Sequence, residues 1–139
     1  MSIGNDKGEA LTIQELPDYT DQYRSLFIEL AKQYKMHIIG GTHVISKGER
    51  LYNVAHMFYP DGRVVEQAKL HITPTEVHEW NISPGAGLEV FETEKGKIAM
   101  LTFDIEFPEI VRMAKAKGAD VIFCPSCTDD RLFSIYVTY

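Results

Sequence analysis

The sequence predicts an α/β fold in which a mixed β-sheet carries helices packed on one side. Three observations predict it: an apolar stripe with helical spacing that ends near residue 34, a β-hairpin over residues 51–70, and a strand–helix–strand unit over residues 98–123. The two strands of a hairpin are antiparallel, whereas two strands joined through a helix are parallel. The predicted sheet therefore contains strand pairs of both kinds.

Composition limits the class of protein. The chain has 139 residues, of which 45% are hydrophobic and 24% are charged, as expected for one modest globular domain. A net charge of −6 argues against a nucleic-acid partner, which needs a basic surface. Two cysteines are too few for a disulfide scaffold, so a reducing cytoplasm is the simplest compartment. No apolar run has the length of a membrane helix and no signal peptide is recognised, so no membrane partner is expected.

The first helix is expected to be capped by Asp18 or Thr20 and to run to about Tyr34. Its apolar residues recur three and four positions apart: Tyr23, Leu26, Phe27, Leu30, Ala31 and Tyr34. Such a stripe predicts a helix that packs on a large apolar surface. Residues 1–16, which precede it, show weak patterning.

Strands and turns follow this helix. The expected strands cover residues 36–40, 51–59, 64–70 and 88–93, and residues 42–46 are expected to continue extended. Pro60-Asp61-Gly62 predicts the turn of the hairpin, because proline fixes the first central position and Asp-Gly suits the next two. Residues 71–87 are loop-rich and include a short helix at about residues 75–80.

The strand–helix–strand unit begins with the apolar run at residues 98–103, which is typical of a buried strand. Pro108 favours the first position of a helix, because that position needs no N–H donor, and Gly118 favours the helix end. Residues 121–123 predict the second, parallel strand. Chemistry in such units concentrates at the carboxyl end of the first strand, here at residues 101–104.

These residues resemble the nucleophile region of the nitrilase superfamily, the carbon–nitrogen hydrolases. Members typically read G-[KR]-I-x-x-x-x-C-[YF]-D-x-x-F-P-E, then a helix, G-A-[DE], a strand and P-[SA]. The matching residues are Gly96, Lys97, Ile98, Phe103, Asp104, Phe107, Pro108, Glu109, Gly118, Ala119, Asp120, Pro125 and Ser126. The chain is one residue short between Thr102 and Phe103, and the residue missing there is the family's nucleophilic cysteine.

Two earlier segments extend the resemblance. Residues 52–55, read with the turn at 60–62, resemble the family's Y-N-x-A hairpin, and residues 69–76 resemble its catalytic-lysine motif, K-x-H-L-x-P-x-E. The resemblance covers about residues 17–131, whereas family domains are about twice as long as this chain. It therefore implies that residues 1–139 form a single, truncated carbon–nitrogen hydrolase domain, a partial α-β-β-α sandwich.

The resemblance also implies a mechanism. In the family a cysteine thiolate attacks an amide or nitrile carbon, a glutamate transfers the proton, and a lysine with a backbone N–H stabilises the tetrahedral intermediate. Lys69 is the expected catalytic lysine, and a solvated strand lysine is the alternative. The other candidate site residues are Glu76, Asp104, Glu109, Thr102 and Phe103.

Each of these other candidates has its own expected role. Glu76 is a supporting acid near the lysine, or alternatively a first-turn helix glutamate. Asp104 is structural, and Glu109 braces the helix start or lies on the surface. Thr102 and Phe103 flank the position of the missing nucleophile. No residue in the sequence has the context of the family's glutamate base.

Residues 124–127, which read CPSC, are the strongest competing motif. A C-x-x-C sequence after a buried strand is typical of thioredoxin-like redox sites, but the long helix that should follow the second cysteine is not evident. The alternative is a buried strand thiol at Cys124 and a loop thiol at Cys127. The five histidines have no zinc-binding spacing, so neither a metal nor a cofactor is expected.

The sequence thus predicts a hydrolase-type domain, amidase- or nitrilase-like, for carbon–nitrogen bonds other than peptide bonds in small amides or nitriles. This copy is expected to be inactive, because both cysteine and glutamate are missing. The alternatives are a non-catalytic truncated or pseudoenzyme interaction domain and, third, a thiol redox protein. By resemblance the chain is expected to form a homodimer.

Overall fold

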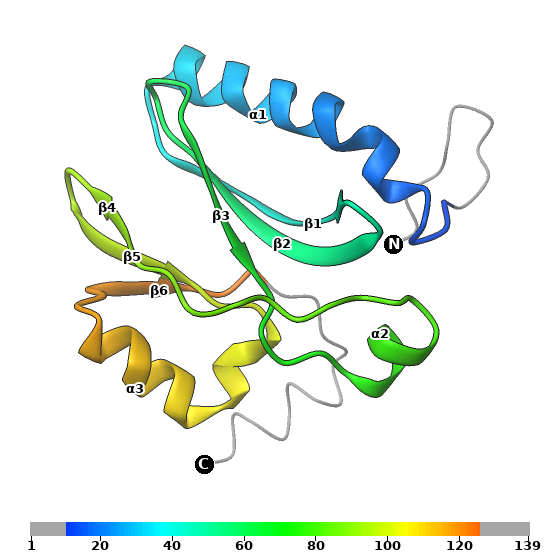
Figure 1. The fold of residues 1–139 in the computed structure, drawn as a ribbon. Coiled ribbons are helices and arrows are strands. Elements are labelled where there is room, and N and C mark those ends of the chain that lie inside the picture. Colours follow the sequence, from blue (N-terminus) through cyan, green and yellow to red (C-terminus); the bar gives the residue numbers. More distant parts are fainter. Residues whose placement is uncertain (1–10, 126–139) are drawn as a thin grey trace, which may run out of the picture.

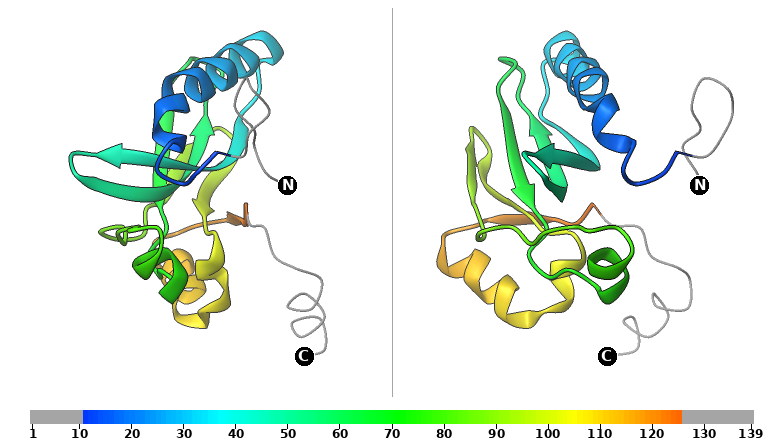
Figure 2. Two further views of the ribbon diagram at one scale, coloured as in Figure 1. Left: turned by 90° about the vertical axis from the view of Figure 1, so that its right-hand side faces the viewer. Right: turned by 45° about the vertical axis from the view of Figure 1, so that its right-hand side comes forward.

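The computed structural model describes residues 11–125, which form four layers in the order helix, sheet, sheet, helix (Figure 1). The first helical layer holds a 3₁₀ turn and the first long helix: η1 (Leu16–Tyr19) and α1 (Thr20–Tyr34). The first sheet holds β1 (Ile38–Lys47), β2 (Arg50–Phe58) and β3 (Val64–Ala68). The second sheet holds β4 (Phe91–Thr93), β5 (Gly96–Met100) and β6 (Val121–Phe123). The last layer is α3 (Pro108–Ala116), on the opposite outer side from α1 (Figure 2).

The strand pairing confirms the predicted fold class. The first sheet has the order β1-β2-β3 and is antiparallel throughout, so the predicted hairpin is present. The second sheet has the order β4-β5-β6, in which β5 pairs antiparallel with β4 and parallel with β6. The strands thus divide between two sheets, and each sheet carries its long helix on one side, as in an α-β-β-α sandwich.

Helix α1 ends at Tyr34 as predicted, but its predicted cap is wrong. The residue before the helix is Tyr19, because η1 leads directly into α1, and no side chain caps the helix N-terminus. The Thr20 hydroxyl instead lies 3.0 Å from Nε2 of His43 on β1. The 3₁₀ turn thus takes the place that the sequence assigned to a capping side chain.

An aromatic cluster fixes α1 on the first sheet. The ring of Phe27 stacks on that of Phe58 at a centroid distance of 5.2 Å, and the ring of Tyr23 meets both edge-on. Gly40 on β1 lies directly beneath them, where a Cβ would fall 2.7 Å from the Tyr23 hydroxyl and 2.9 Å from the Phe58 ring. The glycine is therefore needed for the close approach of helix and strand.

Two further cores build the rest of the sandwich. Between the sheets, Ala55, Met57 and Tyr59 of β2 and its turn pack with Met100 of β5. Between the second sheet and α3, the buried residues are Leu88, Ala99, Leu101, Ile110 and Ala114. Successive residues of β5 therefore serve opposite cores, as the two-residue period of a strand requires.

Three predicted strands are shorter in the structure. The strand expected over residues 64–70 ends at Ala68. The strand expected over residues 98–103 ends at Met100, because Phe103 already begins the 3₁₀ helix η2 (Phe103–Glu106). The strand expected over residues 88–93 is reduced to β4, since Leu88 packs in a loop on the α3 side. The predicted short helix is present as α2 (Pro74–His78).

Glu66 on β3 ties α1 and the first sheet together. Its carboxylate lies 3.2 Å from Arg24 of α1, 2.9 Å from Lys47 of β1 and 3.5 Å from Nε2 of the buried His56 of β2. The imidazole of His56 and then the ammonium of Lys47 hold the pKa of Glu66 at about 2, although burial acts to raise it. The contact with His56 is long for a hydrogen bond, so the contact with Lys47 is the better defined of the two.

This cluster predicts acid sensitivity. Because the pKa of Glu66 is lowered in the folded state, its stabilisation is present above about pH 4.5 and is lost as the pH falls towards 2. After allowance for solvent screening of a partly exposed group, the loss is about 1–2 kcal/mol. Urea unfolding at several pH values between about 6 and 3, where carboxyl groups titrate, measures this loss in the free energy of unfolding. The variant Glu66→Gln is expected to flatten this part of the profile, and an unchanged profile would contradict the assignment.

Candidate active site

The turn after β5 is the centre of the candidate site. The strand leads through Leu101 and Thr102 into η2, and Pro108 then begins α3 at the position where no N–H donor is needed. Thr102 is only 5% exposed, and its hydroxyl has no hydrogen-bond partner among the described residues. The predicted turn, proline and helix start are therefore all present.

Lys69 lies just after β3 and points towards this turn. It is 6% exposed, its Nζ donates a hydrogen bond to Oε2 of Glu76 at 2.6 Å, and Nζ lies 4.9 Å from the ring centroid of Phe103. Its backbone N–H donates to the carbonyl of Asn53, which fixes the chain as it leaves the sheet. A buried, paired ammonium is not the solvated strand lysine of the alternative interpretation.

Glu76 lies both beside Lys69 and in the first turn of a helix, the two positions that the alternative interpretations assign to it. It is in the first turn of α2, and its Oε2 also accepts hydrogen bonds from the backbone N–H and the hydroxyl of Thr73 at 2.8 and 2.9 Å. Burial acts to raise its pKa, but the hydrogen bonds from Lys69 and Thr73 together lower it below the usual range. The carboxylate is therefore held in the charged form opposite the lysine.

Asp104 connects the turn to the segment that follows Lys69. It is 1% exposed, and its carboxylate accepts hydrogen bonds from the N–H groups of Leu70 and His71 at 3.0 and 2.7 Å. A third contact joins Oδ1 to Nδ1 of His71 at 2.7 Å, and the His71 ring stacks on Phe107 at 3.9 Å. This position is consistent with the structural role expected for Asp104.

Glu109 and Cys124 lie at the margin of the turn. Glu109 is exposed in the first turn of α3, where no side chain caps the helix, so its position agrees with the surface alternative. Cys124 follows β6 and is exposed, so the prediction of a buried strand thiol is wrong. Its Sγ donates to the carbonyl of Thr102 at 3.3 Å. Cys127 lies outside the described residues, and with it the second half of the CPSC motif.

The sequence interpretation missed one residue of the site. Thr73 forms a reciprocal capping box with Glu76, in which each side chain contacts the backbone N–H of the other residue. The signal was present as Thr-x-x-Glu at the start of a helix, a known capping sequence. Among the described residues no carboxylate other than Glu76 pairs with Lys69, and no group of three His, Cys, Asp or Glu side chains could hold a metal ion.

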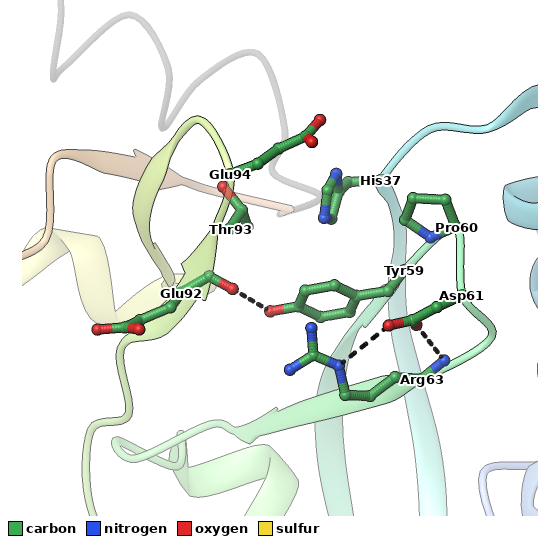
Figure 3. A pocket seen from close by; sticks show the side chains of 8 residues that line it. All are labelled: His37, Tyr59, Pro60, Asp61, Arg63, Glu92, Thr93 and Glu94. Atoms are coloured by element: carbon green, nitrogen blue, oxygen red, sulfur yellow. Dashed lines mark hydrogen bonds and ion pairs between the residues drawn. The ribbon is translucent and has the colours of Figure 1, made fainter.

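A cavity of about 450 Å³ lies elsewhere, between the turn after β2 and the strand β4 (Figure 3). Its lining groups are largely engaged with one another: Tyr59 donates to the carbonyl of Glu92, and the Arg63 guanidinium lies 3.8 Å from the Tyr59 ring centroid. None of the candidate catalytic residues lines it.

Among the described helices, none is both long and apolar enough to cross a membrane.

Comparison with known sequences identifies the family. The sequence model of the family described as "Carbon-nitrogen hydrolase" matches residues 7–134, which is most of the chain. The chain belongs to the carbon–nitrogen hydrolase family. The matched region is wider at both ends than the predicted residues 17–131.

Relatives of this family member are considerably longer. The chain is 45% identical to the "Probable hydrolase YhcX" of Bacillus subtilis over 140 residues, which cover 100% of this chain and 27% of that protein. It is 29% identical to the "Omega-amidase NIT2" of Danio rerio over 121 residues, or 81% of this chain and 43% of the relative. The chain thus spans less than half the length of either relative.

Solved structures confirm the fold of the carbon–nitrogen hydrolases. The crystal structure of Saccharomyces cerevisiae Nit3, described as a member of branch 10 of the nitrilase superfamily, matches with a TM-score of 0.78 and 20% identity. The match covers 94% of this chain and 51% of the Nit3 chain. A carbon–nitrogen hydrolase from Helicobacter pylori G27 matches with a TM-score of 0.78 and 22% identity, over 97% of this chain and 48% of its own.

Proposed function

We propose that this chain is part of an amidase-like hydrolase of small amides or nitriles, and that Lys69 occupies the position of the family's catalytic lysine. The observation that carries the proposal is the buried pair of Lys69 and Glu76 beside the turn at Thr102 and Phe103. Burial of an ammonium group costs desolvation free energy, so a buried lysine indicates a function that requires the charge at that place. Stabilisation of a developing oxyanion next to the turn is a function of this kind.

Each described group has a task in this proposal. Glu76 keeps Lys69 charged and oriented, and Asp104 fixes the lysine segment against the turn through Leu70 and His71. The nucleophile and the proton-transferring glutamate are not among the described groups around Lys69. We therefore propose that this chain by itself does not turn over amides or nitriles, and an interaction domain without catalysis is the alternative.

The proposal is tested by an assay of ammonia release and by restoring a thiol. The purified chain is expected to release no ammonia from ω-amides or aliphatic nitriles. With Cys124 and Cys127 replaced by serine, insertion of cysteine between Thr102 and Phe103 is expected to allow stoichiometric acylation by p-nitrophenyl acetate. Thr102→Cys in the same background is a second variant that does not lengthen the turn.

Dependence on Lys69 separates a site from a merely reactive thiol. Lys69→Met in either thiol variant is expected to slow acylation by roughly 10-fold or more, as removal of an oxyanion donor does. Lys115→Met removes an equal charge from the exposed surface of α3 and is expected to leave the rate unchanged. Two results would overturn the proposal: ammonia release by the unaltered chain that Lys69→Met abolishes, or a rate of acylation that does not depend on Lys69.

The proposal also includes a cytoplasmic location, from the cysteine content, and a homodimer, from the family resemblance.

A further inference from the structure

Strand β6 leaves one edge of the second sheet open. It is the last strand in the order β4-β5-β6 and pairs with β5, so among residues 11–125 no strand pairs with its other edge. Figure 1 shows β6, in orange, on the far side of β5 from β4. The backbone N–H and C=O groups along an open edge are available to pair with another strand.

Two apolar side chains of β6 are exposed beside this edge. Val121 and Phe123 have exposed fractions of 45% and 44%. In the parallel register they are opposite two residues of β5, Ile98 and Met100, which pack in the core between the two sheets. Residues that are paired in this way point to the same face of a sheet. Val121 and Phe123 therefore lie on the inner face of the second sheet, at a place that the first sheet leaves partly uncovered.

The sequence that follows β6 contains a segment that suits this edge. Residues 132–139, which lie outside the part of the chain that the structure describes, read LFSIYVTY. The segment has no charged residue, glycine or proline and is rich in β-branched and aromatic residues, which favour strands. Every second residue is apolar, and we call this set the apolar row: Phe133, Ile135, Val137 and Tyr139. A strand over this segment presents the apolar row on one of its faces.

The connection to β6 determines where this segment can reach. The chain leaves the strand at Phe123, and a segment that returns after a short loop runs antiparallel to the strand before it. Residues 124–131 read CPSCTDDR, in which proline, serine and aspartate favour a loop. Because this loop tethers residues 132–139 beside β6, their effective concentration at the edge exceeds that of the same segment in a second chain.

We propose that residues 132–139 dock in the same chain as an antiparallel strand on the open edge of β6. The apolar row faces the inner side of the sheet and covers Val121 and Phe123, and the opposite face carries Ser134 and Thr138. The backbone groups of β6 gain partners, so the edge is closed against pairing with a second copy. This inference concerns an interaction surface and does not depend on the proposed role of Lys69.

NMR spectroscopy of the complete chain tests the docking. Nuclear Overhauser contacts are expected between the methyl groups of Val121 and those of Ile135 or Val137. Alternate amides of residues 132–139 are expected to exchange with solvent at least about 10-fold more slowly than unprotected amides, and dilution should not change this protection. Exchange at the unprotected rate would overturn the inference. Protection that is lost on dilution would also overturn it, because a second copy would then be the occupant.

Two lysine substitutions test the orientation of the docked strand. Ile135→Lys places a charge in the apolar row, so it is expected to remove the protection of residues 132–139 and to promote association of the chain, measured by light scattering. Ser134→Lys introduces the same charge on the opposite face and is expected to change neither property. Protected amides in β2 report that each variant is folded, and the measurements on the unaltered chain need no variant. Equal effects of the two substitutions would contradict the proposal.

Discussion

Replacement of Asp104 by alanine is expected to destabilise the chain by about 2–5 kcal/mol, because two backbone N–H groups lose a buried acceptor and each such loss costs about 1–3 kcal/mol. The carboxylate is 1% exposed and accepts from the N–H groups of Leu70 and His71 and from the His71 ring. The ring can turn towards solvent, but the two N–H groups belong to the chain that packs on the turn and lose their acceptor. Urea unfolding followed by circular dichroism measures the difference in the free energy of unfolding.

Asp120 provides a matched control for this prediction. Its carboxylate also accepts a backbone N–H, that of Lys97 at 2.8 Å, but Asp120 is exposed. Water replaces the lost acceptor there, so Asp120→Ala is expected to cost less than about 1 kcal/mol. Asp104→Asn should fall between the two alanine variants, because its amide keeps one acceptor oxygen. Equal losses for Asp104→Ala and Asp120→Ala would contradict the assignment of Asp104 as the group that joins the turn to the lysine segment.

Local patterns predicted most elements of the fold, because they report contacts close in sequence. The helical stripe up to Tyr34, the turn at residues 60–62 and Pro108 before α3 each depend on a few neighbouring residues. The division of the strands into two sheets depends instead on distant residues that share one core, such as Met57 and Met100, which no local period encodes. The predicted cap of α1 was wrong because the 3₁₀ turn η1 runs directly into the helix, so no capping side chain stands at its start.

The candidate site divides in the same way. The motif around Lys69 and the turn at Asp104 were predicted from resemblance, and the pairing of Lys69 with Glu76 was suggested by their place in one motif. The three donors to Asp104 lie 33 and 34 residues away in sequence, so the carboxylate's partners required the structure. The contact of Cys124 with Thr102 likewise follows from the parallel register of β5 and β6 rather than from the CPSC sequence.

The buried pair of Lys69 and Glu76 is expected to show a large coupling energy in a double-mutant cycle. Lys69→Met leaves the Glu76 carboxylate buried without its cation, and Glu76→Gln leaves the ammonium without its anion, so either change alone is expected to cost about 3–5 kcal/mol. Thr73 still donates two hydrogen bonds to the carboxylate, which places Lys69→Met at the lower end of this range. The combined variant leaves no charge buried and is expected to cost clearly less than the sum of the single variants.

An exposed pair supplies the reference for this cycle. Lys97 and Glu92 lie 3.2 Å apart on β5 and β4 with well-exposed side chains, and their coupling is expected to be about 0–1 kcal/mol because water screens both charges. The lowered pKa of Glu76 also predicts the direction of the pH dependence. The coupling energy of the buried pair should be fully present above the usual pKa of a glutamate and should fall as the pH decreases. A coupling energy for Lys69 and Glu76 no larger than that of the exposed pair would mean that Glu76 does not hold the lysine in place. The ammonium would then lack the fixed position that stabilisation of an oxyanion at the turn requires.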